Sequence, residues 1–282
     1  VTAAYYYDKA LENGALTAAG KVPYFSTKNR VDSSGVNELR YQLAESYRLY
    51  QNYTMAETLY KQVVEANESD YPLARLWYGL CLRCNNEPSK AVGQLELFIS
   101  SNKDIKENKR YATIAANELK DCLFAIKQSK IATTAKIVEA KTYTFVARSA
   151  TPLNVQDISA IMSRMPGNMQ GGTINLNENY YEVKVTPDSV IAFLPYYGRS
   201  FTAPIGQNEG GVKFNSKKFD YKSTKGRKRG WDIVIDTKDA KENFRLALNI
   251  GDEGYATLSL NSNAKQSITY QGYLKENENK QN

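Results

Sequence analysis

The chain has 282 residues, of which 42% are hydrophobic and 24% are charged, and these proportions are ordinary for a globular protein. Its length suffices for two domains, and no apolar run approaches the roughly 18 residues of a membrane-spanning helix, so none is predicted. The net charge of +7 lies mainly in the second half, since residues 131–282 carry 20 basic and 15 acidic side chains while residues 1–130 carry 17 and 15.

The chain contains no histidine. This removes the side chain that most often performs acid–base catalysis near neutral pH and most often ligates metals through nitrogen. The three cysteines, Cys81, Cys84 and Cys122, are an odd number, so at least one is unpaired within the chain. The Cys81-Leu-Arg-Cys84 spacing also occurs in redox motifs, but here it falls in a predicted helix with no thioredoxin-like strand before it. We interpret these cysteines as packing residues.

Helical patterns fill the first half of the chain. The first predicted helix is short, covers residues 2–13 and ends at Gly14, because glycine adopts the left-handed conformation of a helix end. Pro88 marks another helix start, where its missing N–H costs nothing. The other helices predicted in this half cover residues 36–50, 54–67, 71–84, 88–101 and 107–127.

Four of these helices form two helical hairpins with similar sequence patterns, so the chain contains an internal repeat with an offset of 35 residues. The offset superposes small residues, which let antiparallel helices cross closely, and it also superposes bulky residues between the crossings. This spacing resembles the tetratricopeptide repeat, W-x2-L-G-x2-Y followed by A-x3-F, although Arg40 and Arg75 stand where that family has its leading tryptophan. The resemblance implies a scaffold that binds another protein. The superposed pairs are Leu43 with Tyr78, Ala44 with Gly79, Tyr47 with Leu82, Ala56 with Ala91, Tyr60 with Leu95 and Val63 with Phe98.

The helix predicted at residues 107–127 can cover the open apolar end of the second hairpin, as a stack of repeats requires. Its segment Leu119–Ile126 resembles the closing helix of the tetratricopeptide region in outer-membrane-protein-A-like lipoproteins of Bacteroidetes, including a type 9 secretion component. That resemblance covers about residues 36–127. It implies a periplasmic, outer-membrane-associated protein held by an N-terminal lipid anchor outside this chain. The peptidoglycan-binding domain of that family has no counterpart here.

The apolar period changes from three or four to two near Ala140. We therefore expect a tetratricopeptide-like α-helical domain at residues 1–130, a boundary at residues 128–140, and an antiparallel β domain at residues 138–276. The predicted fold class is multidomain α + β: helical hairpins followed by an antiparallel β meander, either barrel-like or a sandwich. Strand patterns cover residues 181–185, 231–235, 244–250, 256–260 and 268–274, and one further helix is predicted at residues 155–165.

The stretch Phe193–Phe201 reads Phe-Leu-Pro-Tyr-Tyr-Gly-Arg-Ser-Phe, and Gly-Gly-Val-Lys-Phe follows at residues 210–214. Together they resemble the marker of a domain of unknown function found in secreted and lipid-anchored Bacteroidetes proteins, over about residues 138–274. Pro195 and Gly198 interrupt the strand. This places Tyr196, Tyr197 and Arg199 at the end of the strand, where they either contact a ligand or fix the turn.

Seven lysines and arginines lie between Lys217 and Arg229, with Asp220 as the only acidic residue. Such a cluster can attract phosphate, lipid headgroups or polysaccharide carboxylates. The alternative is a solvated hairpin loop whose charge prevents pairing at a sheet edge. No ladder of aromatic residues accompanies the cluster, so nucleic acid is not an expected partner.

The sequence carries no nucleophile elbow, phosphate-binding glycine loop or zinc-protease motif, and no two carboxylates at a spacing typical of a catalytic pair. Asp232 and Asp236 flank one strand, but alternation places them with the solvent. We expect no enzyme activity, no cofactor and no metal site. The expected function is a non-catalytic protein–protein interaction scaffold of the bacterial cell envelope, with other envelope proteins as partners in an outer-membrane or secretion-associated assembly. The alternative is a periplasmic small-molecule or glycan-binding protein that uses the β domain.

The first helix of each hairpin should present one face to the groove of the stack, because residues at spacings of three, seven and ten share a face. A partner could then meet an apolar floor from the second hairpin beside a charged wall from the first, with Tyr41 as an anchor. Alternatively, residues 5–30 fold back and cover that floor within the same chain. The predicted partner-binding residues are Glu38, Tyr41, Glu45 and Arg48 in the first hairpin, and Leu73, Leu76, Leu80 and Arg83 in the second.

Overall fold

The computed structural model divides into two compact units, a helical unit at Val1–Lys127 and a β unit at Gln128–Asn282. Within these, the structure describes residues 4–5, 8–9, 34–102, 105–153, 169–170, 172–176, 180–201, 211–226, 229–240 and 242–277. The helix predicted at residues 155–165 lies outside the described residues, as does most of the one predicted at residues 2–13, of which residues 4, 5, 8 and 9 are helical. Among the described helices, none is long and apolar enough to cross a membrane.

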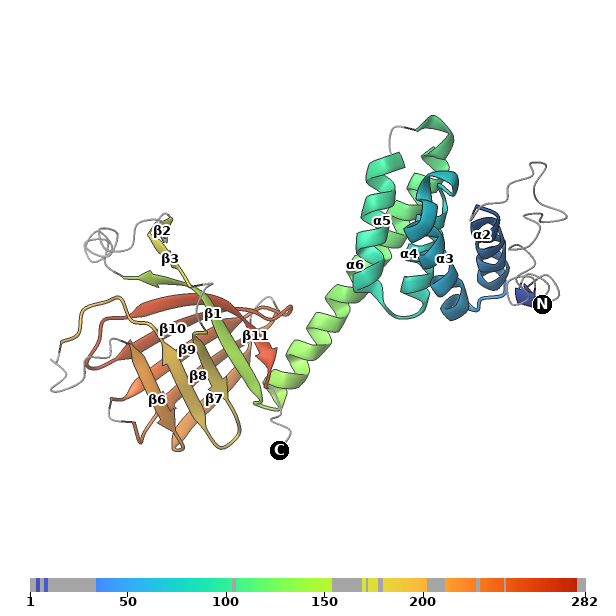
Figure 1. Ribbon diagram of the computed structural model, residues 1–282. Helices are drawn as coiled ribbons and strands as arrows, with labels where there is room; N and C mark the ends of the chain where they lie inside the picture. Colours follow the sequence, from blue (N-terminus) through green and yellow to red (C-terminus); the bar gives the residue numbers. More distant parts are fainter. Residues whose placement is uncertain are drawn as a thin grey trace. The chain divides into compact units, whose positions relative to one another are not determined.

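The helical unit contains the predicted pairs of helices (Figure 1). Among the first four long helices, those that follow one another along the chain pack together. Two short 3-10 turns, Glu68–Asp70 and Lys106–Asn108, lie in the connections. The helices are α2 at Ser34–Leu49, α3 at Tyr53–Asn67, α4 at Ala74–Cys84, α5 at Pro88–Asn102 and α6 at Lys109–Glu139. The prediction of these helices is confirmed, with small shifts at their ends except at the end of α6.

Small residues lie where the helices of a pair meet. Ala44, Ala56, Gly79 and Ala91 are all buried. At Gly79 an added Cβ would lie 2.8 Å from the side chain of Leu95 in α5, which is closer than real Cβ contacts. The spacing that aligned Ala44 with Gly79 in the sequence therefore reflects close packing of helices in the structure.

Helix α6 is longer than the sequence pattern predicts, because it continues to Glu139 instead of ending at Lys127. The predicted boundary segment, residues 128–140, is thus almost entirely helical. Its last turn buries Ile137 and Val138 in the core of the β unit. One buried turn is too short to give a visible apolar period, which explains why the helix was predicted to end at residue 127.

The β unit is one antiparallel sheet that is nearly closed and barrel-like, as the predicted fold class allowed (Figure 1). Its main path runs β6-β5-β4-β1-β11-β10-β9-β8-β7. Off this path, β3 pairs with β1, and β2 pairs with β3. Strand β1, which the sequence analysis did not predict, lies inside the path and pairs with β11. The strands are β1 at Tyr143–Pro152, β2 at Met169–Gln170, β3 at Thr173–Asn175, β4 at Glu182–Val185, β5 at Val190–Leu194, β6 at Val212–Ser216, β7 at Phe219–Lys225, β8 at Trp231–Thr237, β9 at Phe244–Ile250, β10 at Tyr255–Ser262 and β11 at Ile268–Glu276.

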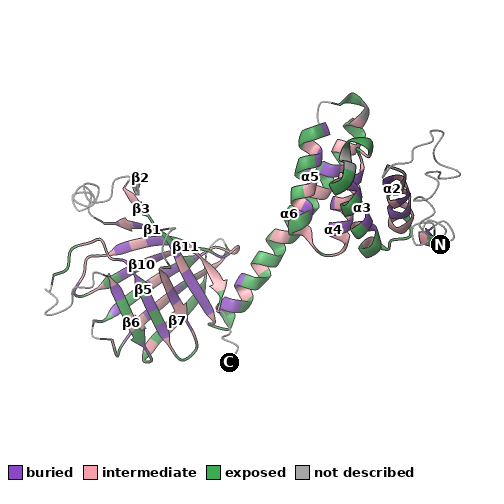
Figure 2. Cartoon of the chain, in the orientation of Figure 1, coloured by how far each residue is buried: buried purple, intermediate pink, exposed green. Residues whose placement is uncertain are grey.

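Alternation along the strands separates a buried face from a solvent face (Figure 2). The buried face carries large side chains such as Tyr143, Phe145 and Tyr270, none of which is exposed. The regular alternation of β1 is broken by a register shift between Ala147 and Ser149. A shift of this kind inserts one residue, here Arg148, and bends the strand.

The basic segment Lys217–Arg229 is mostly a strand and not a loop, because β7 occupies Phe219–Lys225 at one end of the sheet path. Lys217 and Lys218 connect it to β6, the strand at the other end. The carboxylate of Asp239 accepts hydrogen bonds from both of their backbone N–H groups, at 2.9 and 3.0 Å. The exposed Lys222 and Lys225 give this edge the charge that discourages pairing with another chain.

Candidate functional site

The four residues predicted on α2 are all half-buried, and two of them, Glu45 and Arg48, form a hydrogen-bond network with Tyr60 of α3. Arg48 donates a hydrogen bond to Glu45 at 2.6 Å and another to the hydroxyl of Tyr60 at 3.2 Å. The Tyr60 hydroxyl in turn donates to Glu45. These bonds fix the side chains of Glu45 and Arg48 on the face of α2.

Aromatic rings from other segments of the same unit extend this face. The ring of Tyr41 lies 5.1 Å from that of Tyr71 and 6.0 Å from that of Tyr60, measured between centroids. The guanidinium of Arg48 lies 4.2 Å above the ring of Trp77 in α4, a cation–π contact. We call Glu38, Tyr41, Glu45, Arg48, Tyr71, Trp77 and Tyr111 the α2 face, because Tyr71 donates to Glu38 at 3.2 Å and Trp77 meets Tyr111 of α6 edge-on at 6.3 Å.

The phenols of this network keep their protons at neutral pH. Burial, with a smaller contribution from Glu45, raises the pKa of Tyr41 to about 12. Burial and the same carboxylate also raise the pKa of Tyr60. Tyr60 therefore remains a hydrogen-bond donor to Glu45.

The residues predicted on α4 do not form a continuous apolar floor. Leu76 is fully buried with Leu95, Phe98 and Ala115, so the prediction that it contacts a partner is wrong. The reason is that α5 and α6 both supply residues to the cluster around it. Leu73 is half-buried against the same cluster, Leu80 is half-buried, and Arg83 forms an ion pair with Glu118 of α6.

The three cysteines lie in the helical unit as free thiols. Cys81 and Cys122 are buried, and Cys84 is half-buried. Burial raises the pKa of the Cys81 thiol to about 12. A thiol that stays protonated is a poor nucleophile, which agrees with a packing role for Cys81.

The turn after β5 is held by hydrogen bonds to the segment before β11. The Tyr196 hydroxyl donates to the backbone oxygens of Arg199 and Gln266, at 2.8 and 2.9 Å. The buried Tyr270 donates to the backbone oxygen of Pro195 at 2.6 Å. Tyr197 packs against the core of the β unit, and burial raises its pKa. Of the two alternatives left open for this stretch, these contacts favour fixing the turn.

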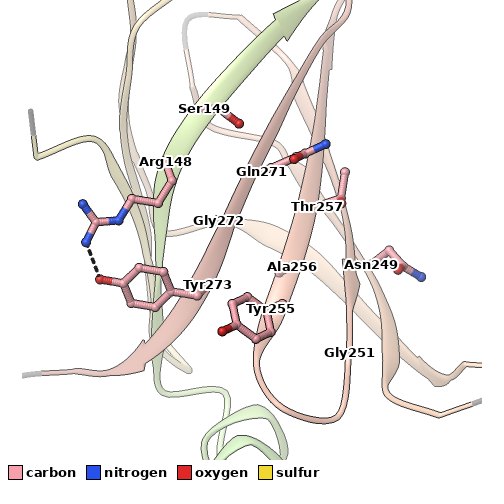
Figure 3. A pocket seen from close by; sticks show the side chains of 10 residues that line it. All are labelled: Arg148, Ser149, Asn249, Gly251, Tyr255, Ala256, Thr257, Gln271, Gly272 and Tyr273. Atoms are coloured by element: carbon pink, nitrogen blue, oxygen red, sulfur yellow. Dashed lines mark hydrogen bonds between the residues drawn. The ribbon is translucent and has the colours of Figure 1, made fainter. Parts of the chain in front are cut away.

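A hollow that the sequence analysis missed lies on the solvent face of β9, β10, β11 and β1. Its volume is about 500 Å³. Cross-strand pairing places one row of uncharged polar side chains across all four strands, since Ser149 pairs with Gln271, Gln271 with Thr257, and Thr257 with Asn249. We call this the sheet-face hollow, and Figure 3 shows the side chains around it.

Two tyrosines and one arginine border this polar row. Tyr255 and Tyr273 pair directly across β10 and β11, and Tyr255 is 66% exposed. Arg148, the inserted residue of the bulge, donates to the Tyr273 hydroxyl at 2.9 Å (Figure 3). Its guanidinium also lies 5.2 Å from the centre of that ring. The hollow therefore combines exposed aromatic surface with neutral hydrogen-bonding groups.

A second hollow, of about 350 Å³, continues from the first. It shares Tyr255 and Tyr273 with the sheet-face hollow and is bordered by the part of α6 that belongs to the β unit. Thr133, Thr134 and Ile137 line that side. The lining also includes four charged residues: Lys130, Glu253, Lys275 and Glu276. The two hollows lie on either side of the tyrosine pair.

The sequence offered little indication of these hollows. Alternation alone predicts that Tyr255, Thr257, Gln271 and Tyr273 face the solvent, but it does not say which of them are neighbours. That depends on the register between strands and on the bulge at Arg148, neither of which a single sequence reveals.

The carboxylates singled out in β8 have ordinary surface partners. Asp232 is exposed and accepts a hydrogen bond from the Asn249 amide at 2.6 Å. Asp236 accepts from Arg245 at 3.3 Å. Their two side chains are thus engaged with separate residues of β9.

Comparison with protein families identifies the second half of the chain. Residues 125–274 match the family described as Domain of unknown function (DUF4251). The chain belongs to the DUF4251 family. This match begins inside α6, so the family's region includes the end of that helix as well as the sheet.

One solved structure similar to this DUF4251 chain is that of a DUF4251 family protein from Bacteroides eggerthii DSM 20697. The two are 13% identical with a TM-score of 0.37, and the match covers 54% of this chain and 91% of that chain. No curated protein is similar enough to this chain to count as a match.

Proposed function

We propose that this DUF4251 protein is a non-catalytic scaffold of the bacterial cell envelope whose helical unit binds another protein. Its partners would be other envelope proteins, in an outer-membrane or secretion-associated assembly. The observation that carries the proposal is the α2 face, on which aromatic and charged side chains from α2, α4 and α6 gather within one unit. Tyrosine, tryptophan and arginine are the residues most often found as anchors of protein interfaces.

The arrangement of the helices supports the same conclusion. The two hairpins repeat with a 35-residue offset and resemble tetratricopeptide repeats, whose stacks form surfaces for protein partners. The hydrogen bonds among Glu45, Arg48 and Tyr60 hold the α2 face in one conformation before a partner arrives. Preorganisation of this kind lowers the entropy that binding must overcome.

The cellular location follows from the resemblance of residues 36–127 to periplasmic Bacteroidetes lipoproteins. We expect the mature protein at the outer membrane, facing the periplasm and held by a lipid anchor that precedes this chain. Fractionation of cells that make the natural full-length precursor tests this expectation. Recovery of the protein in the cytoplasmic fraction would contradict it.

The binding surface is tested by photocrosslinking in the native host. A photoreactive phenylalanine analogue replaces Tyr41, and a control replaces the exposed Phe124 of α6, which is 63% exposed. The proposal expects one envelope protein to crosslink at position 41 and not at position 124. Equal crosslinking at both positions, or none at position 41, would contradict it.

A matched pair of leucine substitutions gives an independent readout. Leu80→Asp introduces a charge on α4, three residues along the helix from Trp77 of the α2 face. Leu97→Asp introduces the same charge on α5, at a leucine that is 51% exposed. We expect the crosslink at position 41 to disappear in the Leu80→Asp background and to persist in the Leu97→Asp background. Leu76 is unsuitable for this test because it belongs to the core.

A further inference from the structure

We propose that the sheet-face hollow of the β unit binds a neutral oligosaccharide. This binding activity is separate from the proposed function of the helical unit and does not depend on it. Three features of the hollow lead to this ligand: its polar row, its exposed tyrosine and its continuation past the tyrosine pair.

The polar row matches a ligand that is rich in hydroxyl groups. Within the described part of the chain, Ser149, Thr257 and Gln271 form no side-chain hydrogen bond with protein. Asn249 donates its amide to Asp232, which leaves its carbonyl oxygen as an acceptor. Hydroxyl and amide groups both donate and accept, as sugar hydroxyls do, so each can pair with the same kind of ligand group.

The charge of the hollow favours a neutral ligand. Arg148 is the one charged residue among the described residues that line it. Its guanidinium already contacts both the hydroxyl and the ring of Tyr273. A phosphate or a carboxylate would therefore find a single cation with other partners, whereas strong anion sites use several free donors.

Tyr255 supplies the apolar part of the site. A pyranose ring has one face of C–H groups and a rim of hydroxyls, and a tyrosine ring likewise has an apolar face and a polar tip. Tyr255 is 66% exposed, and its strand neighbour Thr257 lies in the polar row two residues away. A sugar stacked on Tyr255 would thus have hydroxyl partners beside it.

The size of the site indicates an oligomer. The sheet-face hollow has a volume of about 500 Å³, within the roughly 300–1,000 Å³ typical of ligand sites. The second hollow continues beyond Tyr255 and Tyr273 for about another 350 Å³. Two lysines and two glutamates line it, Lys130, Lys275, Glu253 and Glu276, so their formal charges cancel. A linear chain of sugars can cross the tyrosine pair and occupy both hollows, while a monosaccharide would leave most of this surface in water.

Isothermal titration calorimetry of the full chain tests the proposal with three neutral hexasaccharides: cellohexaose, maltohexaose and chitohexaose. We expect at least one of them to bind. Tyr255→Ala should weaken that binding about tenfold through loss of the stacking surface, and Gln271→Ala should weaken it by a smaller factor. Both residues are exposed, so the fold should tolerate the substitutions.

The matched control is Tyr180→Ala, which removes a tyrosine that is 91% exposed and lies outside the hollow. Its affinity should equal that of the unmodified chain. The proposal is overturned if none of the three hexasaccharides binds. It is also overturned if Tyr180→Ala weakens binding as much as Tyr255→Ala does, or if a hyaluronan hexasaccharide binds and the neutral ones do not.

Discussion

The helical unit and the β unit are stabilised by contacts of different range along the chain. In the helical unit α2 packs on α3, α3 on α4 and α4 on α5. In the β unit the first strand, β1, pairs with the last, β11. The residues of a surface made by helices that are consecutive in sequence can be predicted from helical periodicity. The residues of a surface made by strands that are far apart in sequence can be predicted only when the register between the strands is known. The α2 face is of the first kind, and the sheet-face hollow is of the second.

The chain provides a convenient means of studying the units separately, because it has two tryptophans. Trp77 lies in the helical unit and Trp231 in the β unit. In a Trp77→Phe background, fluorescence reports on the β unit, and in a Trp231→Phe background it reports on the helical unit. Urea unfolding in these two backgrounds therefore measures the stability of each unit by itself.

The largest effect should come from Gly272→Val in β11. An added Cβ at Gly272 would overlap the backbone oxygen of Val146 and lie 3.1 Å from the ring of Phe145. Because the backbone cannot move aside cheaply, we expect the β unit to lose at least about 4 kcal/mol of unfolding free energy. The urea midpoint reported by Trp231 should fall strongly, while the midpoint reported by Trp77 should not change.

The control for this change is Gly251→Ala, where an added Cβ would meet the Tyr255 backbone oxygen at an ordinary 3.5 Å. Its effect should be small. If Gly272→Val shifts both tryptophan transitions equally, the two units do not unfold separately and the comparison fails.

Leu76→Ala should have the next largest effect, this time in the helical unit. The substitution leaves a cavity among Leu95, Phe98 and Ala115, and such cavities cost about 2–5 kcal/mol. The Trp77 transition should shift to lower urea while the Trp231 transition does not. Leu97→Ala, at a leucine that is 51% exposed, serves as the control and should change stability by less than about 0.5 kcal/mol. A similar loss for both variants would mean that Leu76 is not a core residue.

Alkaline pH should lower the stability of the two units over different pH ranges, and the size of this effect should be moderate. The pKa of Cys81 is raised by burial from 9.0 to about 12, so the unfolded chain releases this proton first and folding stability falls as pH rises from about 9. In the β unit the buried Tyr143 and Tyr270 have pKa values raised above 10.0 for the same reason. Their contribution is lost only above pH 10.

Urea midpoints at pH 8, 9, 10 and 11 measure this difference. The Trp77 midpoint should begin to fall at lower pH than the Trp231 midpoint. Burial also raises the pKa of the Cys122 thiol in the same unit, so the test replaces both cysteines. Cys81→Ala with Cys122→Ala should move the onset to above pH 10, where Tyr41, with its pKa raised to about 12, begins to contribute. An onset that is unchanged by this double substitution would show that the thiols are not responsible.

The smallest expected effect is a gain in the stability of the helical unit. Gly93 lies in α5 with nothing within 4 Å of an added Cβ. Replacing it by alanine removes conformational freedom from the unfolded chain and should stabilise the helical unit by about 0.5–1 kcal/mol. A small rise of the Trp77 midpoint, with no change for Trp231, is the expected result. A fall would indicate a contact in the folded state that α5 needs at this position.

Sequence reasoning succeeded where local spacing determines the structure. The offset between Ala44 and Gly79 predicted two helical pairs, and period-two patterns such as Phe244–Ile250 predicted strands. It failed where the decisive contact is distant. Leu76 has the correct spacing for the groove, but α6 helps to bury it. Strand β1 was not predicted, and its partners β4 and β11 lie far from it in the sequence.

The candidate sites differ in the same way. Four residues of the α2 face could be chosen from the sequence, whereas Trp77 and Tyr111, which extend that face, come from other helices. The sheet-face hollow could not be predicted, because the neighbours of Gln271 are set by pairing across β1, β11 and β10.

The pairing of β1 with β11 also determines when the β unit can be completed during protein synthesis. Residue Tyr143 pairs with Glu276, so β1 leaves the ribosome long before its partner exists. At about 5–20 residues per second, the intervening stretch takes roughly 7–27 s to translate. Throughout that interval one edge of β1 lacks its final neighbour, while the helical unit already has all of its own helices. A nascent chain that stalls before residue 268 would therefore carry a finished helical unit and an open sheet edge, which is the form most exposed to aggregation.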